Sequence, residues 1–159
     1  MAQPASSLRN DVTEPETERN KAVFRRYIDE LWNQGRLDII DEIMHEDLFC
    51  HPPSFQGDTY KRDMPGIIEA FHKAFPKGGF TFAIEQMIAE GDKVAVWLSF
   101  KGTQQDTFCG VESSGKMLTF DVLGYYRFLD GKIVEVRKHN VGHNHDFVSA
   151  MGIREQLGT

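Results

Sequence analysis

The densest group of residues able to do chemistry lies near the C-terminus, in the stretch RKHNVGHNHDF at positions 137–147. It contains three histidines, His139, His143 and His145, followed by Asp146. Imidazole and carboxylate groups bind metal ions, and imidazole also transfers protons near neutral pH. The secondary structure that carries these residues decides between the two kinds of site.

The spacing of the histidines argues against a metal site. His139 and His143 are four residues apart, which on a β-strand is about 13 Å at ~3.3 Å per residue. Two ligands of one metal ion lie much closer together than this. A turn would bring His143, His145 and Asp146 together, but no Cys or Glu at a metal-site spacing supports them. We therefore predict no metal ion and no other cofactor.

Proton transfer fits these histidines better, because imidazole titrates near neutral pH without help from its surroundings. On this hypothesis His143 or His139 is the base. The alternative is that His143 and His145 are solvated loop residues or helix caps, with Asp146 in the first turn of that helix.

Asp121 is a further polar candidate, because it interrupts the apolar strand MLTFDVLGYYRF. A buried carboxylate needs a partner, and Arg137 or His139 on a neighbouring strand would supply one. An Asp–His pair would orient the imidazole and make it a stronger base. A structural ion pair or a contact between subunits is the alternative.

The composition is that of a globular protein with one domain. The chain has 159 residues, of which 40% are hydrophobic and 26% charged. Its net charge of −6 argues against nucleic acid as a partner. No apolar run is long enough to span a bilayer, and the two cysteines form no disulfide framework. We expect a cytoplasmic protein, with a flexible tail at residues 1–16 and a single domain at 17–159.

Apolar residues recur at spacings of three and four in the first half of the chain, which predicts three helices. They are expected to run from Thr17 to Trp32, over 37–45 and over 61–75. Residues Asn33-Gln34-Gly35 would end the first, and Pro76 would end the third.

From residue 80 the apolar period changes to two, which is typical of strands. Phe80, Phe82, Ile84 and Ile88 would share one face of the first strand. Strands are expected at 80–88, 94–100, 107–110, 116–129 and 132–141, and a last short helix at 146–156.

Helices followed by an antiparallel meander predict an α+β fold, in which three helices pack on a strongly curved sheet and enclose a pocket. The other face of the sheet would carry Trp97, Leu123 and Tyr125. That is more apolar surface than a solvated face needs, so we expect a second copy of the chain to cover it.

Four segments carry a family resemblance: YIDELWNQGRLDIIDEIMHEDLFCHPP, AFHKAFPKGGFTFAIEQMIAEGDKVAVWLSFKGT, FCGVESSGK and YYRFLDGKIVEVR. From about Asn20 to Gly152 the chain resembles the SnoaL-like polyketide cyclases of the NTF2-like superfamily. The resemblance implies a cone-shaped fold. It is less specific for a reaction, because this fold hosts cyclases, epoxide hydrolases, dehydratases, isomerases and binding domains.

In the family the last strand reads I-V-E-x-W or I-V-E-x-R and is followed by an Asp that acts as general acid/base. IVEVR at 133–137 matches, but the Asp is missing. Counted from Glu135 its position falls on Val141, and counted back from Ala150-Met151-Gly152 it falls on His143. The resemblance therefore implies either Val141 or His143 at the position of the acid/base, and His143 there would keep the capacity for proton transfer.

We predict a cofactor-independent cyclase or isomerase acting on a hydrophobic, polyketide-like carbonyl compound. His143 or His139 would remove a proton next to the carbonyl, Arg137 would stabilise the enolate, and Asp121 would orient the base. The predicted substrate contacts are His51, Tyr27, Phe71, Phe75, Trp97 and Phe108. The alternatives are an epoxide hydrolase or cyclase, and a non-catalytic dimeric domain that binds a small ligand, which the missing Asp favours.

Overall fold

The computed structural model describes residues 14–51, 58–76, 78–108 and 110–142. The predicted first helix is present but has two parts, α1 (Glu16–Arg26) and the π-helix η1 (Tyr27–Asn33). Glu16 and Glu18 lie in the first turn of α1, and Arg25 and Arg26 lie in its last turn. The two glutamates complement the positive end of the helix dipole, so the start of α1 is stabilised by residues that the sequence places there.

The second helical segment is shorter than predicted. It consists of η2 (Leu37–Ile39) and α2 (Ile40–Ile43), and the strand β1 (Met44–Cys50) follows directly. β1 pairs in parallel with the strand β6 (Lys132–Gly142), with Cys50 opposite Val136. The predicted helix to His45 is therefore wrong at its end, because β6 binds residues from Met44 onwards as a strand.

The third helical segment agrees with the prediction. After the short strand β2 (Thr59–Tyr60), the chain forms η3 (Lys61–Asp63) and α3 (Met64–Ala74). The Tyr60 N–H donates to the Asp63 carboxylate at 2.9 Å, which fixes the entry to the helix. Pro65 lies in the first turn of α3, where it costs no hydrogen bond.

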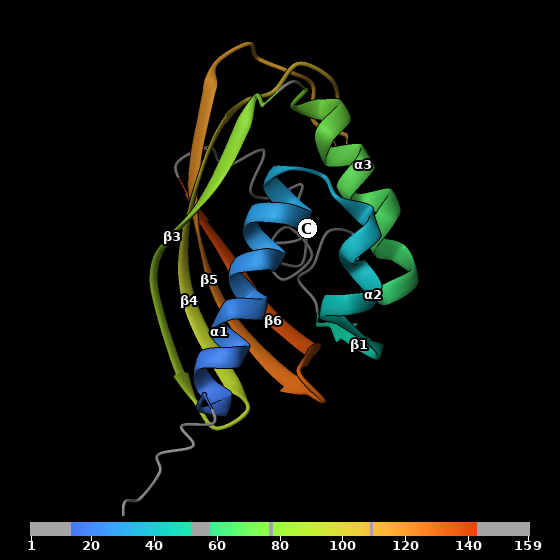
Figure 1. Ribbon diagram of the computed structural model, residues 1–159. Coiled ribbons are helices and arrows are strands. Elements are labelled where there is room, and N and C mark those ends of the chain that lie inside the picture. Colours follow the sequence, from blue (N-terminus) through green and yellow to red (C-terminus); the bar gives the residue numbers. More distant parts are fainter. Residues whose placement is uncertain (1–13, 52–57, 77, 109, 143–159) are drawn as a thin grey trace, which may run out of the picture.

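The remaining strands are β3 (Phe80–Glu90), β4 (Lys93–Thr103) and β5 (Met117–Leu129). In the described residues the strands form one six-stranded sheet in the order β2-β1-β6-β5-β4-β3. Neighbours are antiparallel except for β1 and β6. The labelled helices lie on one side of the sheet (Figure 1). The predicted α+β architecture is thus confirmed, while the strong curvature expected of the sheet stays a prediction.

Two details of the strand prediction are wrong. β3 has an irregularity between Ile84 and Gln86, which shifts its pairing with β4 by one residue. Side chains beyond this bulge change faces, so Ile88 is 71% exposed instead of sharing the buried face of Phe82. The strand expected at 107–110 is reduced to a single bridge between Phe108 and Val111. The predicted C-terminal helix lies outside the described residues.

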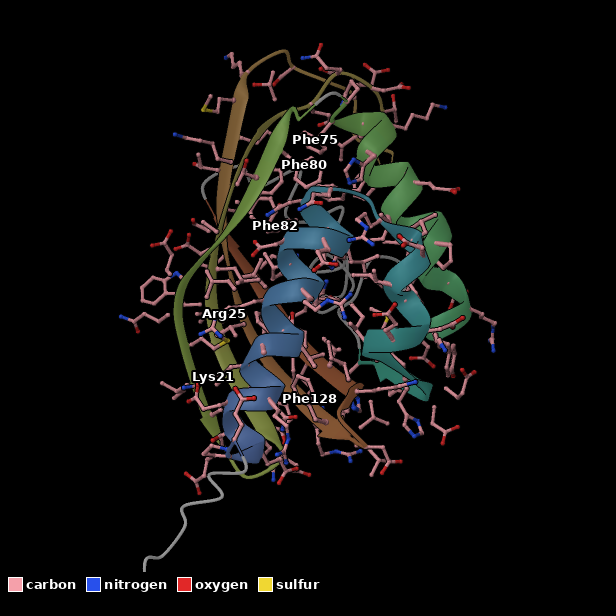
Figure 2. All side chains as sticks on the ribbon, in the orientation of Figure 1. Lys21, Arg25, Phe75, Phe80, Phe82 and Phe128 are labelled. Carbon is pink, nitrogen blue, oxygen red and sulfur yellow. The ribbon has the colours of Figure 1, made fainter. Side chains whose placement is uncertain are left out.

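The core between the helices and the sheet is strongly aromatic. Phe75, Phe80 and Phe82 lie between α3 and β3 (Figure 2). The ring of Phe71 reaches Phe80 with centroids 4.9 Å apart, and Phe100 stacks on Phe120 at 4.5 Å. No helix in the described ranges is long and apolar enough to cross a membrane.

Asn33, the last residue of η1, joins the helices to the edge of the sheet. Its amide donates to the backbone carbonyl of Phe82 at 2.9 Å and accepts from the Phe82 N–H at 2.9 Å. Because β3 ends the strand order, this side chain supplies the hydrogen bonds that a further strand would make.

Replacing Asn33 by Ala is expected to lower the free energy of unfolding by about 1–3 kcal/mol, because both backbone groups of Phe82 lose their partner. Urea unfolding followed by circular dichroism measures this. Gln34→Ala, at the exposed next position, is the matched control and should change stability by less than about 0.5 kcal/mol. Equal stability of the two variants would contradict the role given to Asn33.

Candidate functional site

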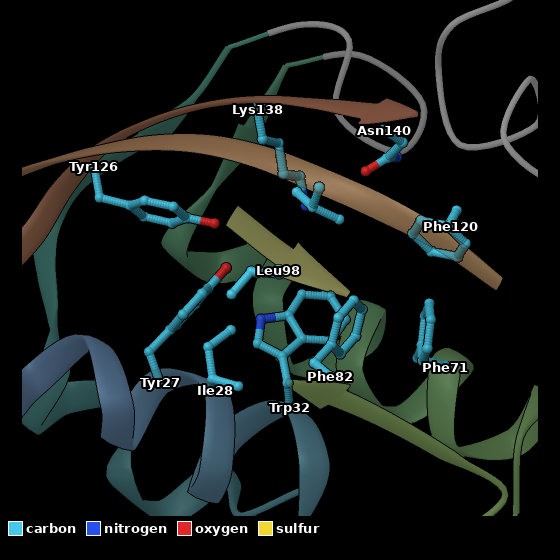
Figure 3. Close-up of a pocket in the computed structure, with 11 residues that line it drawn as sticks. Tyr27, Ile28, Trp32, Phe71, Phe82, Leu98, Phe120, Tyr126, Lys138 and Asn140 are labelled. Atoms are coloured by element: carbon cyan, nitrogen blue, oxygen red, sulfur yellow. The ribbon is translucent and has the colours of Figure 1, made fainter. Parts of the chain in front are cut away.

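A cavity lies between η1 and the helix-facing side of the sheet (Figure 3). The empty space inside it is about 370 Å³, including the part that is open to solvent. The centre of a water molecule can reach only about 20 Å³ of the cavity. The cavity is therefore narrow. Its walls are mostly aromatic and aliphatic, with two polar residues from β6; the lining residues are Tyr27, Ile28, Trp32, Phe71, Phe82, Leu98, Phe120, Val122, Tyr126, Lys138 and Asn140.

The π-helix explains why two large side chains of η1 both reach this cavity. Tyr27 and Trp32 are five residues apart, which on an α-helix is a separation of about 140° around the axis. A π-helix has i→i+5 hydrogen bonds, so the same two residues lie on one side of it. The rings are nearly perpendicular with centroids 6.3 Å apart. His72 on α3 donates to the Trp32 carbonyl at 2.7 Å, which holds the end of η1.

The sheet supplies the opposite wall through the alternation of side chains along each strand. On β6 the inward positions are Val136, Lys138 and Asn140, whereas Arg137 and His139 are exposed on the outer face. Asn140 is one of the buried polar side chains of the described chain. A lysine and an asparagine in this series place an amine and an amide in an otherwise apolar wall.

Three hydrogen-bonding groups of the cavity are connected. The Trp32 indole N–H donates to the Tyr27 hydroxyl, and the hydroxyls of Tyr27 and Tyr126 hydrogen-bond to each other. Burial raises the pKa of Tyr27 and of Tyr126 above the ordinary phenol value. Both phenols therefore stay protonated at neutral pH, and the pair can donate a hydrogen bond to a ligand.

Lys138 crosses the cavity toward η1, with its Nζ 5.5 Å from the centroid of the Trp32 ring. Burial lowers the pKa of the Lys138 amine, because the ammonium form loses its hydration. None of the cavity-lining residues in the described part of the chain is acidic. Burial also raises the pKa of the nearby Cys50 thiol to about 11, so this thiol is neutral at pH 7. The amine is thus more often unprotonated than that of an exposed lysine.

Five of the six predicted substrate contacts fall into three groups. Tyr27 and Phe71 line the cavity, and Phe75 and Phe108 are buried in the core beside it. Trp97 is 44% exposed on the outer face of the sheet.

His51, the remaining predicted contact, lies at the end of β1 and is bound to a carboxylate instead. Its Nε2 is 2.8 Å from Glu135 Oε2, and Arg127 Nε lies 3.4 Å from the other oxygen. The hydrogen bond from His51, and then that from Arg127, lowers the pKa of Glu135.

The predicted catalytic residues that the structure describes lie away from the cavity. Arg137, His139 and Asp121 share one face, as the spacing predicts, but it is the face opposite Lys138. Asp121 pairs with Val141 in register, and no ion pair in the described residues joins it to Arg137 or His139. His143 lies outside the described residues together with His145 and Asp146. The catalytic roles of all four predicted residues stay predictions.

Sequence reasoning missed Trp32, Tyr126, Lys138 and Asn140 as cavity residues. For the two β6 residues a signal was present, because Val134 and Val136 fix the apolar face and Lys138 continues it. In the described chain no three His, Cys, Asp or Glu side chains come together as a metal site.

The outer face of the sheet is apolar in its middle. Trp97, Leu123 and His139 lie side by side on β4, β5 and β6. Trp97 is 44%, Leu123 48% and Val141 56% exposed. We refer to Trp97, Leu123 and Val141 as the outer apolar row.

Solved structures with the same fold come from several bacteria. AclR, a candidate hydroxylase from Streptomyces galilaeus, is 25% identical, with 84% of this chain and 82% of AclR covered and a TM-score of 0.67. A candidate SnoaL-like polyketide cyclase from Jannaschia sp. CCS1 is 22% identical, with 87% and 95% covered and a TM-score of 0.70. IdmH, a candidate polyketide cyclase from Streptomyces antibioticus, is 23% identical, with 88% and 99% covered and a TM-score of 0.67. At these identities, the last two structures show that this chain shares their fold.

A comparison with curated protein sequences returned no match. The family model described as SnoaL-like polyketide cyclase matches residues 22–140. This range includes all the cavity-lining residues and every described helix and strand except the start of α1 and the last two residues of β6. The chain therefore belongs to the SnoaL-like polyketide cyclase family, within the NTF2-like superfamily.

Proposed function

We propose that the protein is a cofactor-independent cyclase or isomerase that moves a proton next to the carbonyl group of a small, flat, polyketide-like compound. The observation that carries this proposal is the hydrogen-bonded Tyr27–Tyr126 pair, which faces the Lys138 amine across a narrow aromatic cavity. Family membership supports the cyclase class. The cavity has room for about one water molecule, so a ring-sized substrate would have to widen it on binding.

In the proposed reaction the substrate carbonyl accepts a hydrogen bond from the Tyr27–Tyr126 pair. Removal of the neighbouring C–H proton leaves an enolate, whose negative charge develops on that oxygen. The phenols suit this task because burial keeps them protonated and few waters compete for the oxygen. The base is a group that is neutral near pH 7. Lys138 is a candidate base in the cavity, because burial lowers the pKa of its amine. His143 is the candidate that the sequence offers at or near the position of the family's Asp.

Tyr126→Phe is expected to slow catalysis by about 10²-fold, since one oxyanion donor is lost while the ring still fills its place. The reaction to follow is deuterium exchange at the carbon next to the carbonyl of 1-tetralone in D₂O, measured by NMR. Tyr60→Phe, which changes an exposed tyrosine outside the cavity, is the control and should keep the wild-type rate.

Exchange at the wild-type rate in both Tyr27→Phe and Tyr126→Phe would contradict the role of the phenol pair. A wild-type protein that binds cyclic ketones tightly but accelerates exchange in none of them would instead support the non-catalytic alternative.

We also propose that two copies of the chain associate through the outer apolar row. This face opposes the helices, so nothing in the described chain covers Trp97 or Leu123. Burial of aromatic and aliphatic side chains at the centre of a sheet face would favour association by removing them from water.

Leu123→Glu is expected to halve the mass in solution without unfolding the protein, because a carboxylate would be buried at the centre of the interface. Light scattering after size-exclusion chromatography gives the mass. Leu129→Glu is the matched control: Leu129 is 44% exposed, similar to Leu123 at 48%, but lies at the β5–β6 turn. A wild-type monomer, or a Leu123→Glu dimer, would rule out this interface.

A further inference from the structure

The pairing of β4, β5 and β6 arranges the outer face of the sheet in tiers that run across the strands. The central tier consists of Trp97, Leu123 and His139. The tier on one side, called the Arg137 tier, consists of Ala95, Tyr125 and Arg137. The tier on the other side, called the Asp121 tier, consists of Ser99, Asp121 and Val141. Neighbouring tiers are two residues apart along each strand, so opposite charges flank the central tier at equal distances.

Among the described residues, neither the Asp121 carboxylate nor the Arg137 guanidinium has a hydrogen-bond or ion-pair partner. The two lie on neighbouring strands but four residues apart in register, ~13 Å at ~3.3 Å per residue. Ser99, beside Asp121 on β4, donates its hydroxyl to a different carboxylate at 2.6 Å. Glu135, two residues before Arg137 on β6, is bound by a histidine and by another arginine. The acids and donors beside each charge are therefore engaged elsewhere.

The positions of these two charges distinguish between ways of placing one outer face on another. In a symmetric pair of chains packed face to face, the two-fold axis lies in the plane of the interface. An axis along β5 would place Asp121 over Asp121 of the second copy, so that like charges meet. An axis along the central tier would place the Asp121 tier of each copy over the Arg137 tier of the other. Opposite charges favour this second orientation.

The distances between packed sheets allow these charges to meet. Stacked sheets lie about 10 Å apart, and neighbouring strands within a sheet about 4.8 Å apart. With the axis along the central tier, Asp121 lies over β5 of the second copy, one strand away from Arg137 on β6. The long side chain of arginine and the short one of aspartate together span this separation.

We propose that the Asp121 carboxylate of each copy forms an ion pair with the Arg137 guanidinium of the second copy. The inference rests on the proposed association through the outer apolar row and adds the orientation of the two copies. Two ion pairs, related by the symmetry axis, then lie on either side of the central tier. They act mainly on which orientation forms, since a rotated arrangement would leave charges in the interface without a partner.

The test is a double-mutant cycle of charge-reversed variants, with the dissociation constant of the dimer measured by analytical ultracentrifugation. Asp121→Arg and Arg137→Asp should each raise the Kd at least ~10-fold, because each brings like charges together at both pairs. The double variant exchanges the two charges and should return the Kd to within ~3-fold of wild type. Its net charge stays at −6, so overall repulsion cannot explain a difference from the single variants.

Glu69→Arg is the matched control for the change in net charge. Glu69 is exposed on α3, away from the outer face, and its reversal changes the net charge by as much as Asp121→Arg does. The Kd of this variant should stay within ~3-fold of wild type, because a charge outside the interface is screened by salt. Asp121→Asn removes the charge with little change of shape, should also raise the Kd, and replaces Asp121→Arg if that variant does not fold.

Weak association of both single variants, with recovery in the double variant, supports the ion pairs. A wild-type dimer that Leu123→Glu dissociates, but that the double variant leaves as weak as the single ones, overturns the ion pairs and keeps the association. Wild-type Kd values in all the variants of Asp121 and Arg137 overturn the ion pairs as well. A wild-type chain that is monomeric at every concentration contradicts both this inference and the proposed association.

Discussion

The alternation of side chains along β6 is the constraint on which the candidate site depends. Successive residues of a strand face opposite sides of a sheet, so each position of β6 belongs either to the cavity or to the outer face. Pairing with β5 on one side and β1 on the other fixes this choice. Lys138 and Asn140 therefore meet the aromatic wall, and Arg137 and His139 meet the exterior. The sheet thus separates Arg137 and His139 from the cavity that Lys138 and Asn140 line.

The wall of the cavity that η1 forms depends on an irregular helix. A regular α-helix over residues 16–33 would have turned Tyr27 and Trp32 to different sides. The π-helix brings both to the cavity, and its end is held by His72 and by the Asn33 contacts to β3. Irregular helical turns of this kind are common at functional sites, since they carry side chains to places that regular turns do not reach.

Much of the fold could be predicted because it follows from local patterns. Periods of three to four and of two located α1 with η1, α3 and the four long strands. β1 was missed because its partner β6 lies more than 80 residues away in the sequence, and apolar spacing around Met44 also fits a helix. The bulge in β3 cannot be recognised from the alternation of apolar residues. The sequence therefore placed Ile88 on the wrong face of the strand.

The candidate site was predicted less well, for a physical reason. Histidines can be recognised as candidate acid/base residues from the sequence alone, because their ordinary pKa is near neutrality. The pKa of a lysine amine falls only when its surroundings remove water from it. At Lys138 these surroundings are residues from η1, β4 and β5, which are distant in the sequence. The parity of Arg137, His139 and Val141 was predicted correctly, but which face of the sheet the helices cover is decided by tertiary packing.

The tight turn between β5 and β6 gives this arrangement an evolutionary consequence. Asp130 and Gly131 both have positive φ, 53° and 74°, as a two-residue hairpin turn requires. Gain or loss of one residue here, with the β1 pairing shifted to match, would exchange the two faces of β6. Arg137 and His139 would then line the cavity, and the amine of Lys138 would lie in solvent. A single insertion or deletion at this turn would therefore change which side chains of β6 face the cavity, without any substitution in the strand itself.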